Sequence, residues 1–519
     1  RGLVDVYKRQ LPYLLLLIVI FIACKSSTLN IIDDRKIEFT FLQLNDVYEI
    51  APIQGGTLGG MARVETVHKE LLKENNNTLL FMAGDFLNPS LLGALKVDGE
   101  RIAGKHMIDV MNSMNFDLVA FGNHEFDLKQ ESLQKRLNES SFPWITGNTK
   151  LRSNGKVMSF YKETSYGKSA ISPTYIFHLE DTDGTKIKIG FISICIPSNP
   201  KQYVEYSDMF DQAKTTYNSI KNNVDVVFGL THAEITHDKK IAALLPNIPL
   251  IMGGHEHENM SIPVGNSVIT KADANAKTVY IHRISFDKQT KETIIKSELR
   301  EINNSIKADE QVGAVVEKWQ QVLKTKIKEI VSNPEEIIYT TKKPLDGRDK
   351  SVRSKQTNLG QIITKSMSFS YNDEVDCAIV NGGSIRIDDE LEGAISPIDI
   401  FRVLPFGGSV IRVEIKGFLL KRVLDYGLLA KGTGAYLQYF NARKVDYKWQ
   451  IEGKELNLDK IYKVAFSDYL LKGLDIPFLS NKNKEVFSIY QPKEKELAFD
   501  IRLAVLEYLK FITKKNIDN

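Results

Sequence analysis

The sequence predicts an α/β fold organised in two domains or more, and three observations support this. Short apolar runs typical of buried strands alternate with segments whose apolar residues recur at helical spacing. With 519 residues, 43% of them hydrophobic, the chain can bury more than one core. Five of the strand-like runs are followed by Asp, Asn or His. Because open α/β sheets build their sites at the carboxyl ends of strands, we expect a layered sheet with a functional site at that edge.

The segment 1–24 is predicted to lie outside the fold. Its apolar run over 11–22 follows Lys8-Arg9 and is shorter than the roughly 20 residues of a membrane span, which favours a secretory signal. The run ends in Phe-Ile-Ala-Cys at 21–24, which resembles a bacterial lipobox, where the cysteine becomes lipidated. We therefore expect an exported protein, lipid-anchored to a bacterial membrane at Cys24 and facing the periplasm or the cell exterior, with 25–35 as a tether. An uncleaved signal anchor is the alternative.

Charge and cysteine content narrow the class of protein further. The 68 basic and 65 acidic residues are nearly balanced, so we expect no nucleic-acid partner, and no obligate protein partner is evident. Besides Cys24, the chain contains Cys195 and Cys377, each in an apolar strand-like run. We expect two buried free thiols rather than a disulfide.

Potential metal ligands follow five strand-like runs in the first part of the chain. Carboxylate and amide oxygens bind hard divalent cations, and imidazole nitrogens bind borderline ones. One such residue alone could be a helix cap or an ordinary loop residue, but five in succession predict a metal site. Helical patterns over 62–74 and 105–115 lie between the runs. The runs with their polar residues are 37–44 with Asp46, 78–83 with Asp85, 117–121 with Asn123, 224–230 with His232, and 249–252 with His255 and His257.

The stretch 121–127, Phe-Gly-Asn-His-Glu-Phe-Asp, adds two candidate catalytic residues. The imidazole of His124 can hold a phosphoryl oxygen, and the carboxylate of Asp127 can orient that imidazole. The remaining histidines lack this context, and we interpret them as surface or structural residues. They are His68, His106, His178, His237 and His282.

A segment over 309–331 has apolar residues at helical spacing and predicts an amphipathic helix that joins two domains. Beyond it, four residues could bind an anionic ligand with a flat ring. Two arginines can clamp an anion, an amide can hydrogen bond, and a phenylalanine beside two glycines can offer a stacking face. Any one of them alone could be a surface ion-pair residue or a core residue. They are Arg353, Arg386, Asn381 and Phe406.

The order of the first set of motifs resembles that of the calcineurin-like metallophosphoesterases. The motifs are Asn45-Asp46, Gly84-Asp85, Gly122-Asn123-His124-Glu125, Thr231-His232 and Gly254-His255-Glu256-His257. Together with the second set, the chain is similar to the bacterial secreted 5'-nucleotidases. This resemblance implies a four-layer αββα domain over 36–303, a linker helix over 304–333, and a smaller α/β substrate-binding domain over 334–519.

The resemblance also implies a role for each candidate residue. Two divalent metal ions, of which Mn, Zn, Fe or Ca remain possible identities, would be bridged by Asp85. One ion would take Asp46, Asp85 and His257, and the other Asp85, Asn123, His232 and His255. His124 and Asp127 would be catalytic. Arg353 and Arg386 would contact the phosphate or ribose of a nucleotide, Asn381 its base, and Phe406 would stack on the base. Phe478 would be the second stacking aromatic, although the family's Gly-Gly-Asp-Gly turn is altered over 472–478.

One position departs from the family pattern. The first strand end usually carries Asp-x-His, and here it reads Asp46-Val47-Tyr48. A phenol with an ordinary pKa near ~10 is a poor ligand. Either a strongly Lewis-acidic metal ionises Tyr48, or Tyr48 only packs at the rim of the site.

Three hypotheses for function follow. The leading one is a metal-dependent phosphoester hydrolase that releases phosphate from nucleoside 5'-monophosphates. The second keeps the site and changes the substrate to 2',3'-cyclic nucleotides or nucleotide sugars. The third is a ligand-binding surface lipoprotein whose catalysis is impaired by Tyr48.

Overall fold

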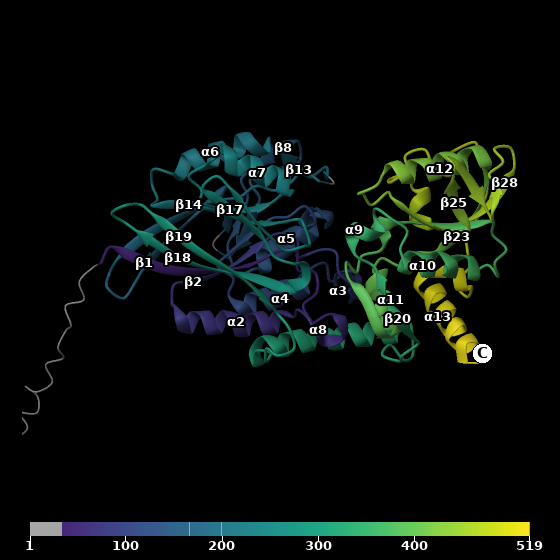
Figure 1. The fold of residues 1–519 in the computed structure, drawn as a ribbon, viewed down its shortest axis with the longest axis horizontal. Coiled ribbons are helices and arrows are strands. Elements are labelled where there is room, and N and C mark those ends of the chain that lie inside the picture. The colour runs from purple at the N-terminus through teal and green to yellow at the C-terminus, as the bar shows by residue number, and fades with distance from the viewer. Residues whose placement is uncertain (1–33, 166, 199, 518–519) are drawn as a thin grey trace, which may run out of the picture.

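The computed structural model describes residues 34–165, 167–198 and 200–517, and it forms two lobes that lie side by side (Figure 1). The predicted signal segment, Cys24 and most of the predicted tether lie outside the described residues. Within the described residues, no helix is both long enough and apolar enough to cross a membrane.

Two six-stranded sheets form the centre of the first lobe. Parallel pairing joins β1, β2, β5 and β6 in one sheet and β12, β14, β15 and β17 in the other, so the carboxyl ends of these strands share an edge. The predicted strands form within two residues of their expected bounds. The first sheet runs β19 (Thr293–Glu301), β18 (Thr278–Asp287), β1 (Lys36–Leu44), β2 (Thr78–Ala83), β5 (Leu118–Ala120), β6 (Trp144–Ile145). The second runs β11 (Thr174–Glu180), β12 (Lys186–Ile192), β14 (Val226–His232), β15 (Leu250–Gly254), β17 (Ser267–Lys271), β16 (Met260–Val264).

The two sheets pack face to face through a buried aromatic core. The ring of Phe41 in β1 lies 5.6 Å from Phe191 and 5.1 Å from Phe228, both in the opposite sheet. Because side chains alternate along a strand, Leu42 and Leu44 of β1 face the other way, into a separate core under the helices.

Helices cover the outer face of each sheet, which completes four layers. The first sheet is covered by α2 (Met61–Glu74) and α4 (Lys105–Met114), and the second by α6 (Met209–Ile220) and α7 (Ile235–Leu244). The predicted αββα architecture is therefore confirmed. Cys195 and Cys377 are buried free thiols, as expected.

The helix between the lobes, α8, runs over Glu310–Lys328 and begins at the capping residue Asp309. Its apolar face, which includes Val312 and Trp319, packs against α2 and α4, and the Trp319 indole donates a hydrogen bond to Asp109 (3.2 Å). The helix therefore lies along the first lobe (Figure 1) rather than standing free between the two lobes.

The second lobe is a five-stranded sheet with helices on both faces. Its helices α10 (Asn358–Phe369) and α13 (Ile501–Ile517) pack together on one face, and α12 (Gly417–Leu429) covers the other. Strand order is β24 (Leu437–Phe440), β21 (Cys377–Asn381), β28 (Ile461–Ser467), β23 (Val410–Lys416), β29 (Val486–Tyr490).

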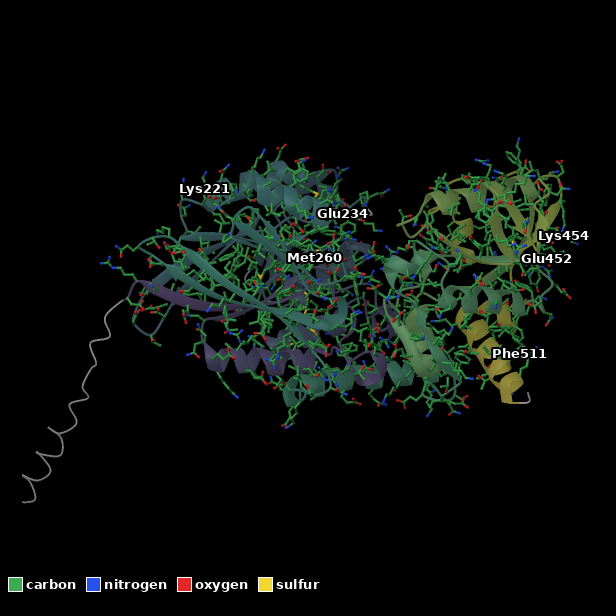
Figure 2. All side chains as sticks on the ribbon, viewed as in Figure 1. Lys221, Glu234, Met260, Glu452, Lys454 and Phe511 are labelled. Atoms are coloured by element: carbon green, nitrogen blue, oxygen red, sulfur yellow. The ribbon has the colours of Figure 1, made fainter. Side chains whose placement is uncertain are left out.

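Shorter elements of the second lobe divide between its two sides. The pair β20 (Tyr339–Asp346) and β22 (Glu390–Ile395), with α9 (Asp349–Val352) and α11 (Pro397–Val403), lies on the side that faces the first lobe (Figure 1). Glu452, between β26 (Lys448–Ile451) and β27 (Lys454–Glu455), and Lys454, the first residue of β27, lie on the opposite edge (Figure 2).

Candidate metal centre

Three buried side chains converge where β1, β2 and β14 end. We call Asp46, Asp85 and His232 the ligand cluster, because their potential ligand atoms all lie within 4.8 Å of one another. The His232 Nε2 atom lies 3.0 Å from Asp85 Oδ2 and 3.9 Å from Asp46 Oδ1. Two carboxylates and an imidazole at this spacing form a donor set suited to a divalent cation.

Two buried atoms beside the cluster test whether a cation fits. Within the part of the chain that the structure describes, neither Asn123 Oδ1 nor His232 Nε2 has a hydrogen-bond partner. His232 donates from Nδ1 to the Ala83 carbonyl (2.8 Å), so in its neutral form its Nε2 carries a lone pair directed at the cluster. Because an unpaired buried polar atom is costly, these two atoms fit a metal ion as their missing partner.

The loop after β15 brings two more histidines to the same place. The backbone N–H of His255 donates to Asp46 Oδ2 (2.9 Å), and the His255 ring centroid lies 5.4 Å from that of His232. His257 places its Nε2 3.4 Å from Asp46 Oδ1. Asn123 lies between two residues that contact Asp85, since His124 N donates to Asp85 Oδ1 (2.8 Å) and Gly122 is packed against it. The structure thus brings the chain segments that carry all six predicted metal ligands to one place.

The backbone at the site combines positive φ angles at non-glycine residues with close packing at two glycines of the motifs. Asp46, Asp85 and His255 all have positive φ angles, of 52°, 56° and 87°. A Cβ on Gly122 would lie 2.2 Å from Asp85 Oδ1, and one on Gly254 would lie 2.4 Å from the Ala83 carbonyl oxygen. Strain of this kind persists at functional sites, where the surrounding structure enforces it.

The charges of the cluster stabilise one another. Burial opposes ionisation of Asp85, but the charge of His232 prevails and holds the Asp85 pKa below its usual value. Burial likewise disfavours charged His232, yet Asp85 and Asp46 raise the pKa of His232 to about 9. Burial and the nearby charge of His232 lower the pKa of His255 to about 3. His255 is therefore neutral, which a metal-binding imidazole must be.

Tyr48 lies inside the site. It is buried, and its hydroxyl lies 3.3 Å from Asp85 Oδ2, 3.5 Å from Asp46 Oδ1 and 3.3 Å from His257 Nε2. Burial first, and then the two carboxylates, raise the pKa of Tyr48 well above its usual value. The phenol therefore donates a hydrogen bond to the ligand cluster. Tyr48 thus lies inside the site and does not merely pack at its rim.

His124 and Asp127 form a dyad next to the cluster. His124 donates from Nδ1 to Asp127 Oδ2 (2.6 Å), and Lys201 contacts the other carboxylate oxygen (2.9 Å). Burial opposes ionisation of Asp127, but the hydrogen bond from His124 leads the effects that lower its pKa. Both side chains retain some exposure, 16% and 19%, so the dyad is accessible from the solvent side.

Sequence reasoning missed two buried residues that hold the site together. Glu125 accepts hydrogen bonds from four backbone N–H groups, and it ties the end of β5 to the loop after β2. Burial, followed by the charge of Asp85, raises the Glu125 pKa to about 7. The amides belong to Gly122, Asp85, Phe86 and Leu87. Glu125 could have been identified from the sequence by its position inside the 121–127 motif.

The second missed residue is Lys271, which is fully buried under the loop that carries His255 and His257. Its ammonium group donates to the Gly254 carbonyl (2.8 Å) and pairs with Asp238 (2.9 Å) and Glu256. A buried lysine in a strand-like run carries no local signal, because only tertiary contacts identify its partners.

The predicted substrate-binding residues of the second lobe differ in their partners and in their exposure. Arg353 pairs with Asp349 of α9 (2.9 Å), and the backbone N–H of Arg386 donates to the Val403 carbonyl (2.9 Å). The Asn381 amide donates to Asp475 (2.8 Å). Phe406 is 53% exposed.

Phe478 is not presented freely. Its ring packs edge-on against Tyr426 of α12, with centroids 5.5 Å apart, and the Arg422 guanidinium lies 4.3 Å from its centroid. The altered turn before it therefore leaves this aromatic packed on the second lobe.

The other histidines have structural partners or lie away from the cluster. His106 contacts Ser90 (3.2 Å) and His282 contacts Gln43 (3.0 Å), and burial leads the effects that lower the pKa of each to about 3. His178 is exposed.

Comparison with known proteins identifies relatives over most of the chain. Residues 39–259 match the model of the calcineurin-like phosphoesterases, and residues 337–480 match that of the 5'-nucleotidase C-terminal domain. The chain is 25% identical to the trifunctional nucleotide phosphoesterase protein YfkN of Bacillus subtilis, over 84% of this chain and 32% of that longer protein. It is 26% identical to the 5'-nucleotidase of Homo sapiens, over 80% of this chain and 78% of the relative.

A solved structure shares the fold. The 5'-nucleotidase precursor from Thermus thermophilus superposes with a TM-score of 0.72 at 21% identity, covering 92% of this chain and 97% of that one.

Proposed function

Because the chain belongs to the calcineurin-like phosphoesterases that carry a 5'-nucleotidase C-terminal domain, we propose that it is a metal-dependent hydrolase releasing phosphate from nucleoside 5'-monophosphates. One observation carries the proposal. Two buried atoms, Asn123 Oδ1 and His232 Nε2, have no hydrogen-bond partner among the described residues, and they lie on the two chain segments that contact Asp85. A divalent cation that takes a phosphate ester as a further ligand would complement them.

Asp46, Asp85 and His257 would hold one divalent ion, and Asp85, Asn123, His232 and His255 would hold a second. When bound, such a pair would polarise the phosphoryl group and supply a hydroxide nucleophile at neutral pH.

The protein side chains contribute the rest of the reaction. Asp127 fixes the ring of His124 by accepting from Nδ1, and the Nε2–H of the His124 imidazolium would donate a hydrogen bond to a phosphoryl oxygen as negative charge develops. Arg353 and Arg386 bind the anionic part of the substrate. Asn381 contacts the base, and exposed Phe406 stacks on it. Phe478 takes part only if its ring leaves Tyr426.

This assignment divides the chain by task. Residues 36–303 hold the metal and the catalytic dyad, 304–333 connect the lobes, and 334–519 bind the nucleotide. The two parts must meet for cleavage, and domain closure of this kind typically takes place on the μs–ms scale.

Phosphate release from nucleoside 5'-monophosphates by the purified protein tests the proposal. Activity should vanish on chelation, return with Mn²⁺ or another divalent ion, and be lost with most of the metal in Asp85→Asn. The matched control is Asp446→Asn, at an exposed turn of the second lobe. Full activity of Asp85→Asn would refute the bridging role.

A second candidate keeps the same site but changes the substrate. The relative in Bacillus subtilis is described as a trifunctional nucleotide phosphoesterase, which favours including 2',3'-cyclic nucleotides and nucleotide sugars in the same assay. Metal binding without hydrolysis of any of these esters would instead support a ligand-binding lipoprotein with impaired catalysis.

We also propose that the protein is exported and lipid-anchored at Cys24, on the basis of the apolar run and lipobox-like sequence. A single acyl chain binds membranes only marginally, and several chains anchor firmly. Mass spectrometry of the membrane fraction should find a mature form that begins at lipidated Cys24, and an unmodified Cys24 would refute the anchor.

A further inference from the structure

One carboxylate of the second lobe contacts a candidate metal ligand of the first. Asp388 lies in the loop before β22, and its side chain is only 12% exposed. Its Oδ2 atom accepts a hydrogen bond from His257 Nδ1, although the two residues are 131 positions apart. Its Oδ1 atom accepts from the backbone N–H of Asp349 (2.6 Å), at the start of α9. Both carboxylate oxygens are therefore held in place.

This contact determines which nitrogen of His257 is free. A carboxylate accepts only from a protonated nitrogen, so Nδ1 carries the proton and neutral His257 presents a lone pair on Nε2. That Nε2 atom lies 3.4 Å from Asp46 Oδ1 and 3.3 Å from the Tyr48 hydroxyl. Imidazoles that bind metals are commonly oriented by a carboxylate in this way, and the carboxylate also makes the imidazole a stronger ligand.

We propose that Asp388 is a positioning residue, through which the second lobe orients His257 and completes the metal centre only when the two lobes are docked. The inference rests on the proposed function, because it assumes that His257 binds a metal ion. It goes further by making one metal ligand depend on the position of the substrate-binding lobe.

Other contacts between the lobes agree with this coupling. Gln54 donates to Asp389 (2.7 Å), Arg402 approaches Glu49 (3.4 Å), and Lys350 pairs with Glu258 (3.0 Å). Glu49 is next to Tyr48 in the chain, and Glu258 is next to His257, so lobe contacts flank the site on both segments. Contacts of this polar kind are typical of interfaces that open and close.

The backbone at Asp388 also has the character of a functional position. Its φ angle is 44°, in the left-handed region, which Asp and Asn enter more readily than most residues and which glycine adopts freely. Asp388→Gly therefore removes the carboxylate without adding strain. Asp388→Asn keeps the shape and an acceptor oxygen but removes the charge, and charge-assisted hydrogen bonds are about twice as strong as neutral ones.

The test measures metal binding of the full chain with Mn²⁺ or Zn²⁺ alone, by competition with a metal buffer, beside far-ultraviolet circular dichroism for folding. Asp388→Gly should weaken binding of one ion by about 10- to 100-fold, as expected for loss of an orienting partner. The control Asp389→Ala breaks the hydrogen bond to Gln54 in the same loop and should bind metal as the wild type does. If Asp388→Gly does not fold, a loss of metal affinity of about threefold or more in Asp388→Asn supports the proposal, because that variant also weakens the hydrogen bond from His257.

Three outcomes overturn the inference. Wild-type affinity in Asp388→Gly, or in Asp388→Asn where the glycine variant does not fold, shows that the contact does not position a ligand. An equal loss in Asp389→Ala assigns the effect to the lobe contacts in general. A wild type that binds no divalent metal defeats the inference and the proposed function together, whereas a wild type that binds metal without hydrolysing nucleotides defeats only the proposed function.

Discussion

Two buried carboxylates at the site, Glu125 and Asp85, differ in what their oxygens contact. Glu125 accepts four backbone N–H groups, so its hydrogen-bonding capacity is used in holding two loops together. Asp85 accepts from the backbone of His124 and otherwise faces Tyr48 and His232. Because the two residues have different partners, only Asp85 is available to bind a metal ion.

At the scale of single residues, His124→Ala should lower kcat by about 10²–10³-fold while leaving metal content unchanged, because it removes a group that stabilises developing charge. Steady-state kinetics with elemental analysis measures both quantities. His178→Ala, which changes an exposed histidine, should retain wild-type kinetics. Loss of metal together with activity would show that His124 is a ligand.

Tyr48→Phe removes a single hydroxyl from the ligand cluster. We expect metal content to remain and kcat to fall by no more than about tenfold, because a hydrogen bond contributes about 0.5–1.5 kcal/mol. The iron-loaded wild type should show no visible phenolate-to-metal absorption. A coloured protein that bleaches and loses metal in Tyr48→Phe would instead identify phenolate as a ligand, which favours a harder ion such as Fe³⁺.

At the scale of elements, the ends of two strands at the site, β1 and β15, are braced by buried polar residues. Gln43 of β1 donates to the carbonyls of Gly253 (3.1 Å) and Thr270 (2.9 Å) in the opposite sheet, and Lys271 supports the loop after β15. The contacts of Gln43 join the two sheets at the edge where the ligands converge. The aromatic core holds the sheets together elsewhere.

His282 of β18 belongs to this polar layer and makes stability depend on pH. Burial lowers its pKa to about 3, so it stays neutral in the folded state while the unfolded chain binds a proton below about pH 6.5. Its contribution is complete above about pH 6.5 and is lost as pH falls toward 3, at about 1.4 kcal/mol per pH unit. Between pH 6.5 and 5, the free energy of unfolding of the wild type should therefore fall by about 2 kcal/mol more than that of His282→Gln.

Denaturant unfolding at several pH values measures this difference. Parallel pH profiles for wild type and variant would show that His282 is protonated in the folded state.

At the scale of the whole molecule, two lobes with separate sheets share one polar contact region. The first lobe contributes the ligand cluster, and the second contributes Asp388, which accepts a hydrogen bond from His257. Exposed Phe406 belongs to the second lobe. A substrate bound by the second lobe must therefore reach the first lobe for its ester to be cleaved.

Phe406→Ala should raise KM for a nucleoside 5'-monophosphate by about tenfold or more, because stacking on a base contributes about 1–3 kcal/mol. It should leave KM for p-nitrophenyl phosphate, which has no base, nearly unchanged. The control is Phe487→Ala, since Phe487 is 52% exposed on the same lobe. Equal losses on both substrates would mean that Phe406 has only a packing role.

The sequence by itself determined the five strands that precede the candidate ligands, and the order of those ligands. Alternating and helical apolar patterns are local properties, so they predicted the strands within two residues of their observed bounds. The residues after β1, β2, β5, β14 and β15 could be predicted to meet, because parallel strands place their carboxyl ends at one edge.

Only the tertiary structure decided which distant residues support those ligands. Lys271 pairs with Asp238, and Asp388 accepts from His257 at a separation of 131 residues. Tyr48 could be placed at the rim or inside from its sequence, and packing set its hydroxyl among Asp46, Asp85 and His257. Such contacts join elements that are far apart in the sequence, so no local apolar pattern predicts them. They depend on how whole sheets and lobes pack, and packing is a property of the complete chain.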